Sequence, residues 1–146
     1  DYTVLIDYSH TPDSLENILR AVRGFCTGRI IAVFGCGGDR DPFKRPVMGK
    51  IAAELSDLAI VTSDNPRTED PYKILRQILA GMQDTETPYE VIESRVSAIG
   101  RAMELAQKDD VIVLCGKGHE TYQEVGHEKH HLDEREVVAS YLEANA

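Results

Sequence analysis

The sequence of 146 residues contains no tryptophan and only three cysteines, Cys26, Cys36 and Cys115. Because their number is odd and none of them forms a C-x-x-C motif, the sequence does not indicate a disulfide framework. We interpret the three residues as reduced, structural thiols of a cytoplasmic protein. A catalytic cysteine is the less favoured alternative.

Long apolar runs and positive charge are also scarce. No apolar run approaches the roughly 20 residues that a membrane-spanning helix requires, and the first residues do not resemble a signal peptide. The formal net charge is −9, which argues against a general nucleic-acid or anionic-membrane binder, since either would need a basic face. The length suits a single domain, residues 1–146, with a core of its own.

Short apolar segments alternate with amphipathic segments along the chain. Residues 29–34 and 110–114 are almost continuously apolar, as in strands that are buried on both faces of a parallel sheet. A helix start is indicated by Thr11 as N-cap, followed by Pro12 at the first helical position. The alternation predicts an α/β fold, namely a doubly wound, mostly parallel sheet with helices on both faces.

Strands are expected at residues 4–6, 29–34, 58–62, 89–92 and 110–114, and helices are expected to begin at residues 12, 46, 71, 95 and 134. Asp133 is expected to cap the last of these helices. Weak alternation in residues 121–132 predicts a short antiparallel hairpin near the C-terminus. Because the chain begins at the edge of a strand and without methionine, we expect it to be one domain of a longer protein.

Four polar or glycine-rich loops follow expected strands: Asp7–Thr11, Gly35–Arg45, Ser63–Asp70 and Cys115–Glu120. The carboxyl ends of parallel strands lie at one edge of a sheet, and open α/β sheets bind their ligands there. The four loops together therefore predict one composite binding site.

The third of these loops contains the segment Asp64-Asn-Pro-Arg67. Asp64 can accept hydrogen bonds, and Asn65 can both donate and accept them. Pro66 fixes the turn, and Arg67 offers a planar fork that matches a carboxylate. Taken alone, the segment is better explained as a polar turn in which Asp64 or Asn65 caps the next helix; the neighbouring loops favour a site.

The glycine loops do not form a complete nucleotide site. Neither glycine–lysine pair, at 49–50 or at 116–117, is followed by the Ser or Thr of a P-loop, and the loop at 35–38 lacks the G-x-G-x-x-G spacing. A bound nucleotide would therefore need another domain to hold most of its phosphates. Four histidines lie between residues 119 and 131, but no cysteine pair or acidic cluster completes a metal site, so a solvated histidine-rich turn is favoured.

Charge matching gives a more specific prediction. Arg40 and Arg67 are cationic, whereas Glu120 is an anion beside glycines. Such a set suits a ligand that bears both carboxylates and ammonium groups, such as an amino acid. The alternatives are a local ion pair of Arg40 with Asp39 or Asp41, and a solvent-exposed carboxylate at Glu120.

Five motifs then point to a known family. In chain order they are Asp7-Tyr-Ser-His-Thr-Pro-Asp13, Phe34-Gly-Cys-Gly-Gly-Asp-Arg-Asp41, Lys44-Arg-Pro46, Thr62-Ser-Asp-Asn-Pro-Arg67 and Gly116-Lys-Gly-His-Glu120. Together they closely resemble the C-terminal domain of the Mur ligases, and among these the ligases that add meso-diaminopimelate to UDP-N-acetylmuramoyl-L-alanyl-D-glutamate. The resemblance extends from Asp1 to Glu136, which is nearly the whole chain.

The resemblance implies a monomeric, cytoplasmic, ATP-dependent ligase of peptidoglycan precursor synthesis. In that family ATP phosphorylates the glutamate side-chain carboxylate, and an amine attacks the acyl phosphate to form an amide. Two further domains hold the UDP-sugar, most of the ATP and Mg²⁺, whereas this domain binds the amino acid and closes over ATP. We therefore expect the isolated domain to be inactive, with no catalytic residue, no metal, and no nucleic-acid or membrane partner.

The resemblance assigns binding of meso-diaminopimelate to Arg40, Asp64, Asn65, Pro66, Arg67, Gly116 and Glu120. It assigns Asp7 to the ribose and His10 to the neighbourhood of the nucleotide. Arg67 favours diaminopimelate over lysine, because lysine lacks the distal carboxylate and lysine-adding relatives typically lack this arginine. The alternatives are a lysine-adding ligase and a stand-alone amino-acid-binding module.

Overall fold

Five parallel strands form the centre of the molecule, in the spatial order β1-β5-β2-β3-β4. The computed structural model describes residues 1–145, and its strands are β1 (Thr3–Asp7), β2 (Ile30–Phe34), β3 (Leu58–Val61), β4 (Tyr89–Val91) and β5 (Val111–Cys115). Every residue of β2, β3 and β5 is buried, which explains their apolar sequences. The predicted strands are confirmed, with ends that differ by no more than one residue.

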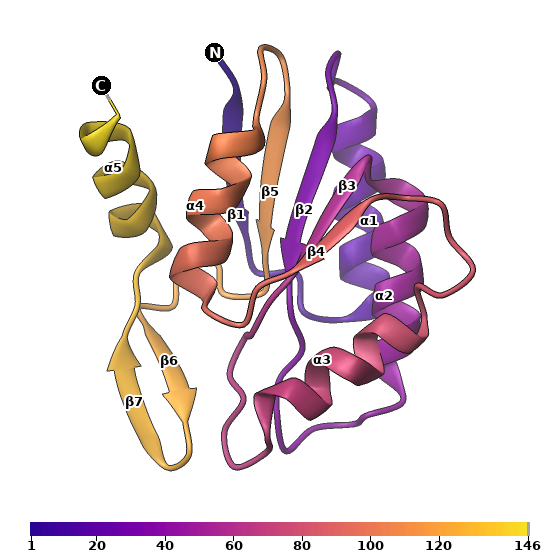
Figure 1. Cartoon of the computed structure of the whole chain (residues 1–146), viewed down its shortest axis with the longest axis vertical. Helices are drawn as coiled ribbons and strands as arrows, with labels where there is room; N and C mark the ends of the chain where they lie inside the picture. Colours follow the sequence, from indigo (N-terminus) through magenta and orange to yellow (C-terminus); the bar gives the residue numbers. More distant parts are fainter. Residues whose placement is uncertain (146) are drawn as a thin grey trace.

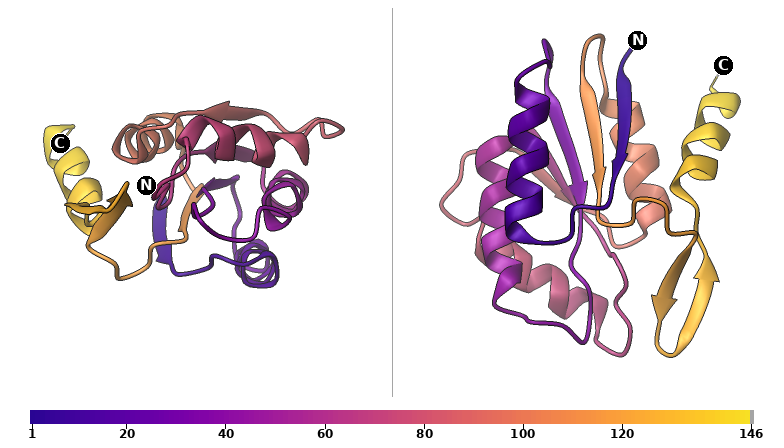
Figure 2. Two further views of the ribbon diagram at one scale, coloured as in Figure 1. Left: turned by 90° about the horizontal axis from the view of Figure 1, so that it is seen from below. Right: turned by 180° about the vertical axis from the view of Figure 1, so that it is seen from behind.

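Helices cover both faces of this sheet, as Figure 1 and Figure 2 show. One face carries α1 (Pro12–Arg23), α2 (Lys44–Leu55) and α3 (Pro71–Ala80), and the other carries α4 (Arg95–Leu105) and α5 (Glu134–Ala144). The predicted doubly wound α/β fold is confirmed. Among residues 1–145, no helix has the length and apolar character needed to cross a bilayer.

Alternation along β2 connects the two halves of the core. Successive strand residues point to opposite faces of a sheet. Accordingly, Ile30, Ala32 and Phe34 pack in the cluster that includes α1, α2 and α3, whereas Ile31 and Val33 pack in the cluster that includes α4. The strand is therefore buried by helices on both sides, and its carboxyl end is held rigidly.

The first two helices begin where their capping groups allow. Thr11 caps α1 as predicted, because its hydroxyl accepts a hydrogen bond from the Ser14 amide (3.2 Å). Helix α2 begins at Lys44, two residues before the predicted start at Pro46. A proline in the first helical turn lacks an amide that would have no intrahelical partner in any case, so Pro46 did not mark the boundary.

Helix α3 is capped by Asp70, whose carboxylate accepts a hydrogen bond from the Tyr72 amide (3.0 Å). The alternative explanation of Asp64 and Asn65 as caps of this helix is therefore wrong. Both residues are buried, with 8% and 5% exposed surface, and they lie in the connection that precedes the cap.

The predicted hairpin is confirmed as β6 (Tyr122–Val125) and β7 (Glu128–His131), which form a separate two-stranded antiparallel sheet. Gly126 lies in its turn with φ +63°, a conformation that suits glycine. The backbone of Arg67 bonds to this hairpin on both sides: its amide donates to Glu124 O (3.0 Å), and its carbonyl accepts from the Gly126 amide (2.6 Å). The hairpin is thereby attached to the loop that follows β3, at the end of the molecule toward which the strands point (Figure 1).

Candidate functional site

A cavity of about 370 Å³ lies at the carboxyl edge of the sheet, and all four predicted loops line it. Tyr8 and His10 come from the loop after β1, and Arg40 from the loop after β2. The loop after β3 contributes its buried polar segment, and the loop after β5 contributes Gly116 and Glu120. The size is in the range typical of small-molecule sites, so the composite site that the topology predicted exists as a physical space.

Most of the predicted site residues meet in this cavity. Its lining includes Arg40, Asp64, Asn65, Arg67, Gly116, Glu120 and His10. Two predicted site residues, Pro66 and Asp7, are not among the described residues that line the cavity.

The two residues outside the lining have local contacts instead. The carbonyl of Pro66 lies so close to Gly38 that a Cβ there would be 1.8 Å from its oxygen, so glycine is required for the two loops to touch. The Asp7 carboxylate accepts hydrogen bonds from the amide (2.9 Å) and the hydroxyl of Ser9. Asp7 therefore orders the turn after β1.

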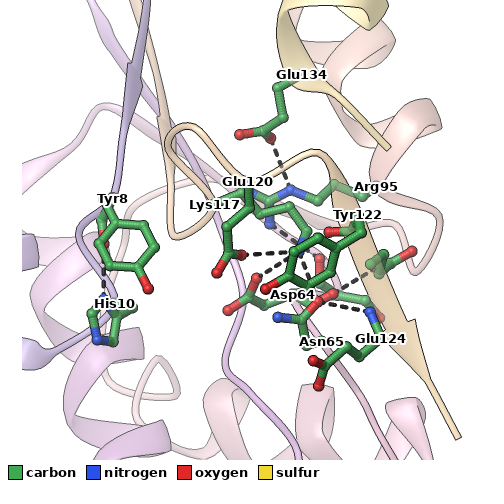
Figure 3. A network of polar contacts seen from close by, with 12 residues as sticks. Tyr8, His10, Asp64, Asn65, Arg95, Lys117, Glu120, Tyr122, Glu124 and Glu134 are labelled. Carbon is green, nitrogen blue, oxygen red and sulfur yellow. Dashed lines mark hydrogen bonds and ion pairs between the residues drawn. The ribbon is translucent and has the colours of Figure 1, made fainter. Parts of the chain in front are cut away.

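A fully buried lysine, Lys117, connects three residues that line the cavity, as Figure 3 shows: Asp64, Asn65 and Glu120. Its ammonium donates to Asn65 Oδ1 (2.7 Å) and to the carbonyl of Tyr122 (2.9 Å). It also lies 3.4 Å from Asp64 Oδ1 and 3.7 Å from Glu120 Oε1. One cation thus compensates two carboxylates whose side chains are only 11% and 17% exposed.

Burial lowers the pKa of Lys117 below its usual range, and the neighbouring carboxylates of Asp64 and Glu120 oppose that shift. The glycine–lysine pair at 116–117 lacks the Ser or Thr of a P-loop, and its sequence indicates no other role for the lysine. The structure shows that the Lys117 ammonium contacts the predicted ligand-binding residues Asp64, Asn65 and Glu120. A lysine between two glycines in a strand-end loop was the available signal, and it gave no indication of burial.

The same contacts define how Asn65 is oriented. Its Oδ1 accepts hydrogen bonds from the Lys117 ammonium (2.7 Å) and from the Glu124 amide (2.9 Å). Both partners can only donate, so the oxygen must face them and the amide Nδ2 must face the other way. Because Asn65 lines the cavity, its Nδ2 is available there as a hydrogen-bond donor.

Arg67 is anchored by two partners. Its Nε donates to Glu124 Oε2 (2.8 Å), and its NH1 donates to the Gly38 carbonyl (2.9 Å). The residue has φ +52°, which is uncommon for a side chain of this size. The guanidinium is therefore only partly available to a ligand, which differs from the free fork assumed from the sequence.

Arg40 has few partners in the protein. Its NH1 donates to the backbone carbonyl of Asp39 (3.0 Å), and in the described part of the chain no ion pair with Asp39 or Asp41 is formed. Its side chain lines the cavity and can approach an anion there. The alternative of a local ion pair is not supported.

An aromatic group borders the cavity on the side of β1. The Tyr8 ring lies 4.8 Å from that of His10 and 5.7 Å from that of His119, measured between centroids. The charge of Glu120 raises the pKa of Tyr8, and burial adds to the effect. Figure 3 shows Tyr8 and His10 beside each other, apart from the cluster around Lys117.

The cysteines do not form a reactive group. All three thiols are free, and burial raises the pKa of Cys36 and of Cys115 to about 12. Both thiols are therefore protonated at neutral pH and are poor nucleophiles. This agrees with their interpretation as structural residues, although Cys36 borders the cavity.

The described residues were expected neither to hold a nucleotide by themselves nor to bind a metal ion. The ammonium of Lys117 is engaged by protein groups, so the loop Gly116–Gly118 offers no free cation to a phosphate. Among residues 1–145, no group of three or more His, Cys, Asp or Glu side chains is arranged to hold a metal ion. The described residues alone do not fit a nucleotide–metal centre.

Comparisons with known proteins agree with the fold and the motifs. A family described as "Mur ligase, glutamate ligase domain" matches residues 1–118. A UDP-N-acetylmuramoyl-L-alanyl-D-glutamate--2,6-diaminopimelate ligase of Trichormus variabilis is 64% identical over 142 residues, which are 97% of this chain and 28% of the relative. The protein of the same name from Clostridium tetani is 55% identical over 142 residues, which are 97% of this chain and 29% of the relative.

A solved structure of another ligase with this name superposes with a TM-score of 0.95 at 40% identity. The superposition covers 99% of this chain and 30% of the other. The chain therefore spans less than a third of the length of the relatives it matches.

Proposed function

The chain belongs to the Mur ligase family, and from this premise we propose that it is the amino-acid-binding domain of an ATP-dependent ligase specific for meso-diaminopimelate. The acceptor in this proposal is UDP-N-acetylmuramoyl-L-alanyl-D-glutamate, as in the names of the relatives. The whole enzyme would act in peptidoglycan precursor synthesis. We further propose that residues outside this chain hold the acceptor, Mg²⁺ and most of the ATP.

The distribution of charge in the cavity is the observation that carries the proposal. Arg40 and Arg67 offer guanidinium groups, and Asn65 offers an amide donor, whereas Asp64 and Glu120 offer carboxylates. Meso-diaminopimelate has two carboxylates and two ammonium groups. A cavity that combines both signs of charge in this way matches such a ligand better than it matches a purely anionic or apolar one.

We assign each end of the ligand to groups that can satisfy it. Arg67 and the Nδ2 of Asn65 would bind the distal carboxylate, and Arg40 would bind the other carboxylate. Glu120 and the Gly116 carbonyl would accept hydrogen bonds from an ammonium group. The anchored guanidinium of Arg67 supports this assignment, because a cation that is already oriented loses less freedom on binding.

The remaining predicted residues have supporting roles in the proposal. Asp64 would contribute negative charge near the ammonium, and Pro66 would shape the loop through its contact with Gly38. His10 would lie near the nucleotide, since it borders the cavity. Asp7 would face the ribose, although its carboxylate now orders the turn through Ser9.

The chemistry of the proposed reaction assigns a clear task to this domain. ATP would convert the glutamate carboxylate of the acceptor into an acyl phosphate. The amine of the bound amino acid would then form the C–N bond while the C–O bond to phosphate breaks, and the amine would release a proton. The domain would hold the amine in place for this attack, which is an orientation effect. By itself it would not ligate.

The substitution Arg67→Ala in the complete ligase tests the proposal. Loss of a desolvated charge pair costs about 2 kcal/mol or more, so we expect the KM for meso-diaminopimelate to rise about 30-fold or more. Steady-state kinetics with varied amino acid, at saturating ATP and acceptor, measure this effect. Arg20→Ala is the matched control, because Arg20 lies on α1 with a 63% exposed side chain.

An Arg67→Ala enzyme with unchanged KM for meso-diaminopimelate would remove the basis for the site assignment. A competition assay with lysine completes the test. We expect the unmodified ligase to incorporate diaminopimelate in strong preference, and preferential use of lysine would contradict the proposed substrate.

A further inference from the structure

Glu124, in the hairpin β6–β7, contacts Arg67 and does not line the larger cavity. Glu124, on β6, lines a separate shallow cavity of about 260 Å³ that it shares with Arg67. Arg67 lines both this cavity and the larger one, whereas Glu124 does not line the larger one. Arg67 thus borders the cavity of the predicted ligand, whereas Glu124 contacts it without lining that cavity.

Glu124 contacts Arg67 and Asn65 through three different groups. Its carboxylate accepts a hydrogen bond from Arg67 Nε (2.8 Å), and its backbone carbonyl accepts one from the Arg67 amide (3.0 Å). Its own amide donates to Asn65 Oδ1 (2.9 Å). The two residues that we assign to the distal carboxylate are therefore both bound by this one residue.

Only some of the N–H donors of the Arg67 guanidinium are bound by protein groups in the described part of the chain. Arginine has five N–H donors in a rigid plane. Nε is bound by Glu124, and one donor of NH1 is bound by the Gly38 carbonyl. In the described part of the chain the NH2 group has no hydrogen-bond partner, so Glu124 and Gly38 fix the plane and leave the remaining donors for a ligand.

We propose that Glu124 is a positioning residue that presents the Arg67 guanidinium to the distal carboxylate and thereby increases discrimination against lysine. This inference rests on the proposed function. The arginine side chain has large rotamer freedom, and its loss on ligand binding is smaller when an ion pair has already ordered it. Because Glu124 lies behind the arginine and outside the larger cavity, it orients the cation without occupying the ligand position.

Substitution of Glu124 in the complete ligase separates positioning from a general effect of charge. Glu124→Ala keeps all backbone hydrogen bonds to Arg67 and Asn65 but removes the acceptor of Nε. We expect the KM for meso-diaminopimelate to rise about tenfold, with kcat and the KM for ATP unchanged. The KM for lysine should stay the same, because lysine has no distal carboxylate, so the selectivity ratio should fall by the same factor.

Two further variants serve as controls. Glu124→Gln retains an oxygen that accepts from Arg67 Nε, so its KM should stay within about threefold of the unmodified ligase. Glu128→Ala removes an equal charge from the same hairpin, where the Glu128 side chain is 79% exposed and forms an ion pair with His130 (3.7 Å). That variant should match the unmodified ligase.

The outcomes are distinct. An unchanged or lower KM for diaminopimelate in Glu124→Ala would overturn the inference. Equal increases of this KM in Glu124→Ala and Glu124→Gln would also overturn it, because they would show that the negative charge of Glu124 matters and that its hydrogen bond to Arg67 Nε does not. If Glu128→Ala had the same effect as Glu124→Ala, the inference would also be wrong. Failure of the proposed function is recognised separately, because Arg67→Ala would then leave the KM unchanged.

Discussion

At the scale of single residues, the most informative side chain is Lys117. It is completely buried, yet its ammonium has two hydrogen bonds and two neighbouring carboxylates. Removal of one partner from a buried ionic group is costly, because the partners left behind have lost their solvation and gained nothing in return. Lys117 therefore stabilises the site and orients Asn65 at the same time.

This leads to a prediction for Lys117→Met, which retains most of the side-chain volume but not the charge. The carboxylates of Asp64 and Glu120 would remain close together without a cation. We expect the free energy of unfolding at neutral pH to fall by about 3–5 kcal/mol, as measured by urea denaturation. Lys50→Met, at a 67% exposed position on α2, should change it by less than about 0.5 kcal/mol; similar small effects of both substitutions would contradict this account of Lys117.

Single residues also define what the sequence could and could not predict. Asp64, Asn65 and Arg67 could be selected because they follow an apolar strand directly, and their place at the sheet edge follows from topology alone. The contacts of Lys117 with Asn65 and of Glu124 with Arg67 join residues 52 and 57 positions apart. No local pattern encodes such a contact, since it depends on how the loop after β5 and the hairpin pack against the loop after β3.

At the scale of elements, a buried ion pair connects α4 and α5 to the ends of two strands. Arg95 Nε donates to Glu134 Oε2 (2.8 Å), and both side chains are completely buried. The other guanidinium nitrogens of Arg95 donate to the carbonyls of Ser63 (3.1 Å) and Cys115 (2.9 Å). These carbonyls lie at the start of two of the four loops that line the cavity, so the pair links the position of α5 to the geometry of the site.

A double-mutant cycle tests this connection. We expect Arg95→Met and Glu134→Gln each to lower the free energy of unfolding by about 3 kcal/mol or more, because each leaves its former partner buried. The double variant should lose about 2 kcal/mol less than the sum of the single losses, since neither partner is then left alone. Chemical denaturation measures all three values, with Glu136→Gln as an exposed control on the same helix; strict additivity would show that the two residues act independently.

The elements themselves were largely predictable, and the reasons are local. Continuous apolar residues identified β2, β3 and β5, and Thr11 with Pro12 identified the start of α1. The start of α2 was misplaced because a proline is tolerated throughout the first turn of a helix. The caps at Asp70 and Asp133 have ordinary side-chain hydrogen bonds, but only Asp133 was identified as a cap from the sequence.

At the scale of the whole molecule, the Arg45 side chain connects α2 to the loop after β2, to the loop before α3 and to α3 itself. The Arg45 guanidinium forms a bidentate pair with Glu69, at 2.7 and 3.0 Å, and it also donates to Gln77 (2.6 Å) and to the Gly37 carbonyl (2.9 Å). Arg45 is 1% exposed. These contacts join α2 to α3, and α2 contributes Lys44 and Met48 to the lining of the cavity.

This pair makes the stability of the whole fold depend on pH. The hydrogen bonds from Arg45 lower the pKa of Glu69 from its ordinary value of 4.5 to about 2. Above pH 4.5 the carboxylate is ionised in both the folded and the unfolded chain, so the stabilisation is complete. As the pH falls from 4.5 to about 2, the unfolded chain binds the proton first, and the contribution is lost progressively.

We therefore expect Glu69→Gln to lower the free energy of unfolding by about 2–3 kcal/mol at pH 7, and the difference from the unmodified chain to shrink steadily below pH 4.5. Urea denaturation at pH 7, 4.5, 3.5 and 2.5 measures the difference in the free energy of unfolding between Glu69→Gln and the unmodified chain at each pH. Glu54→Gln is the matched control on α2, because Glu54 is 55% exposed and lies 3.9 Å from its partner Lys50. If the Glu69→Gln difference were constant over this range, the pair with Arg45 would not lower the pKa of Glu69, and the acid sensitivity of the fold would have to come from its other carboxylates.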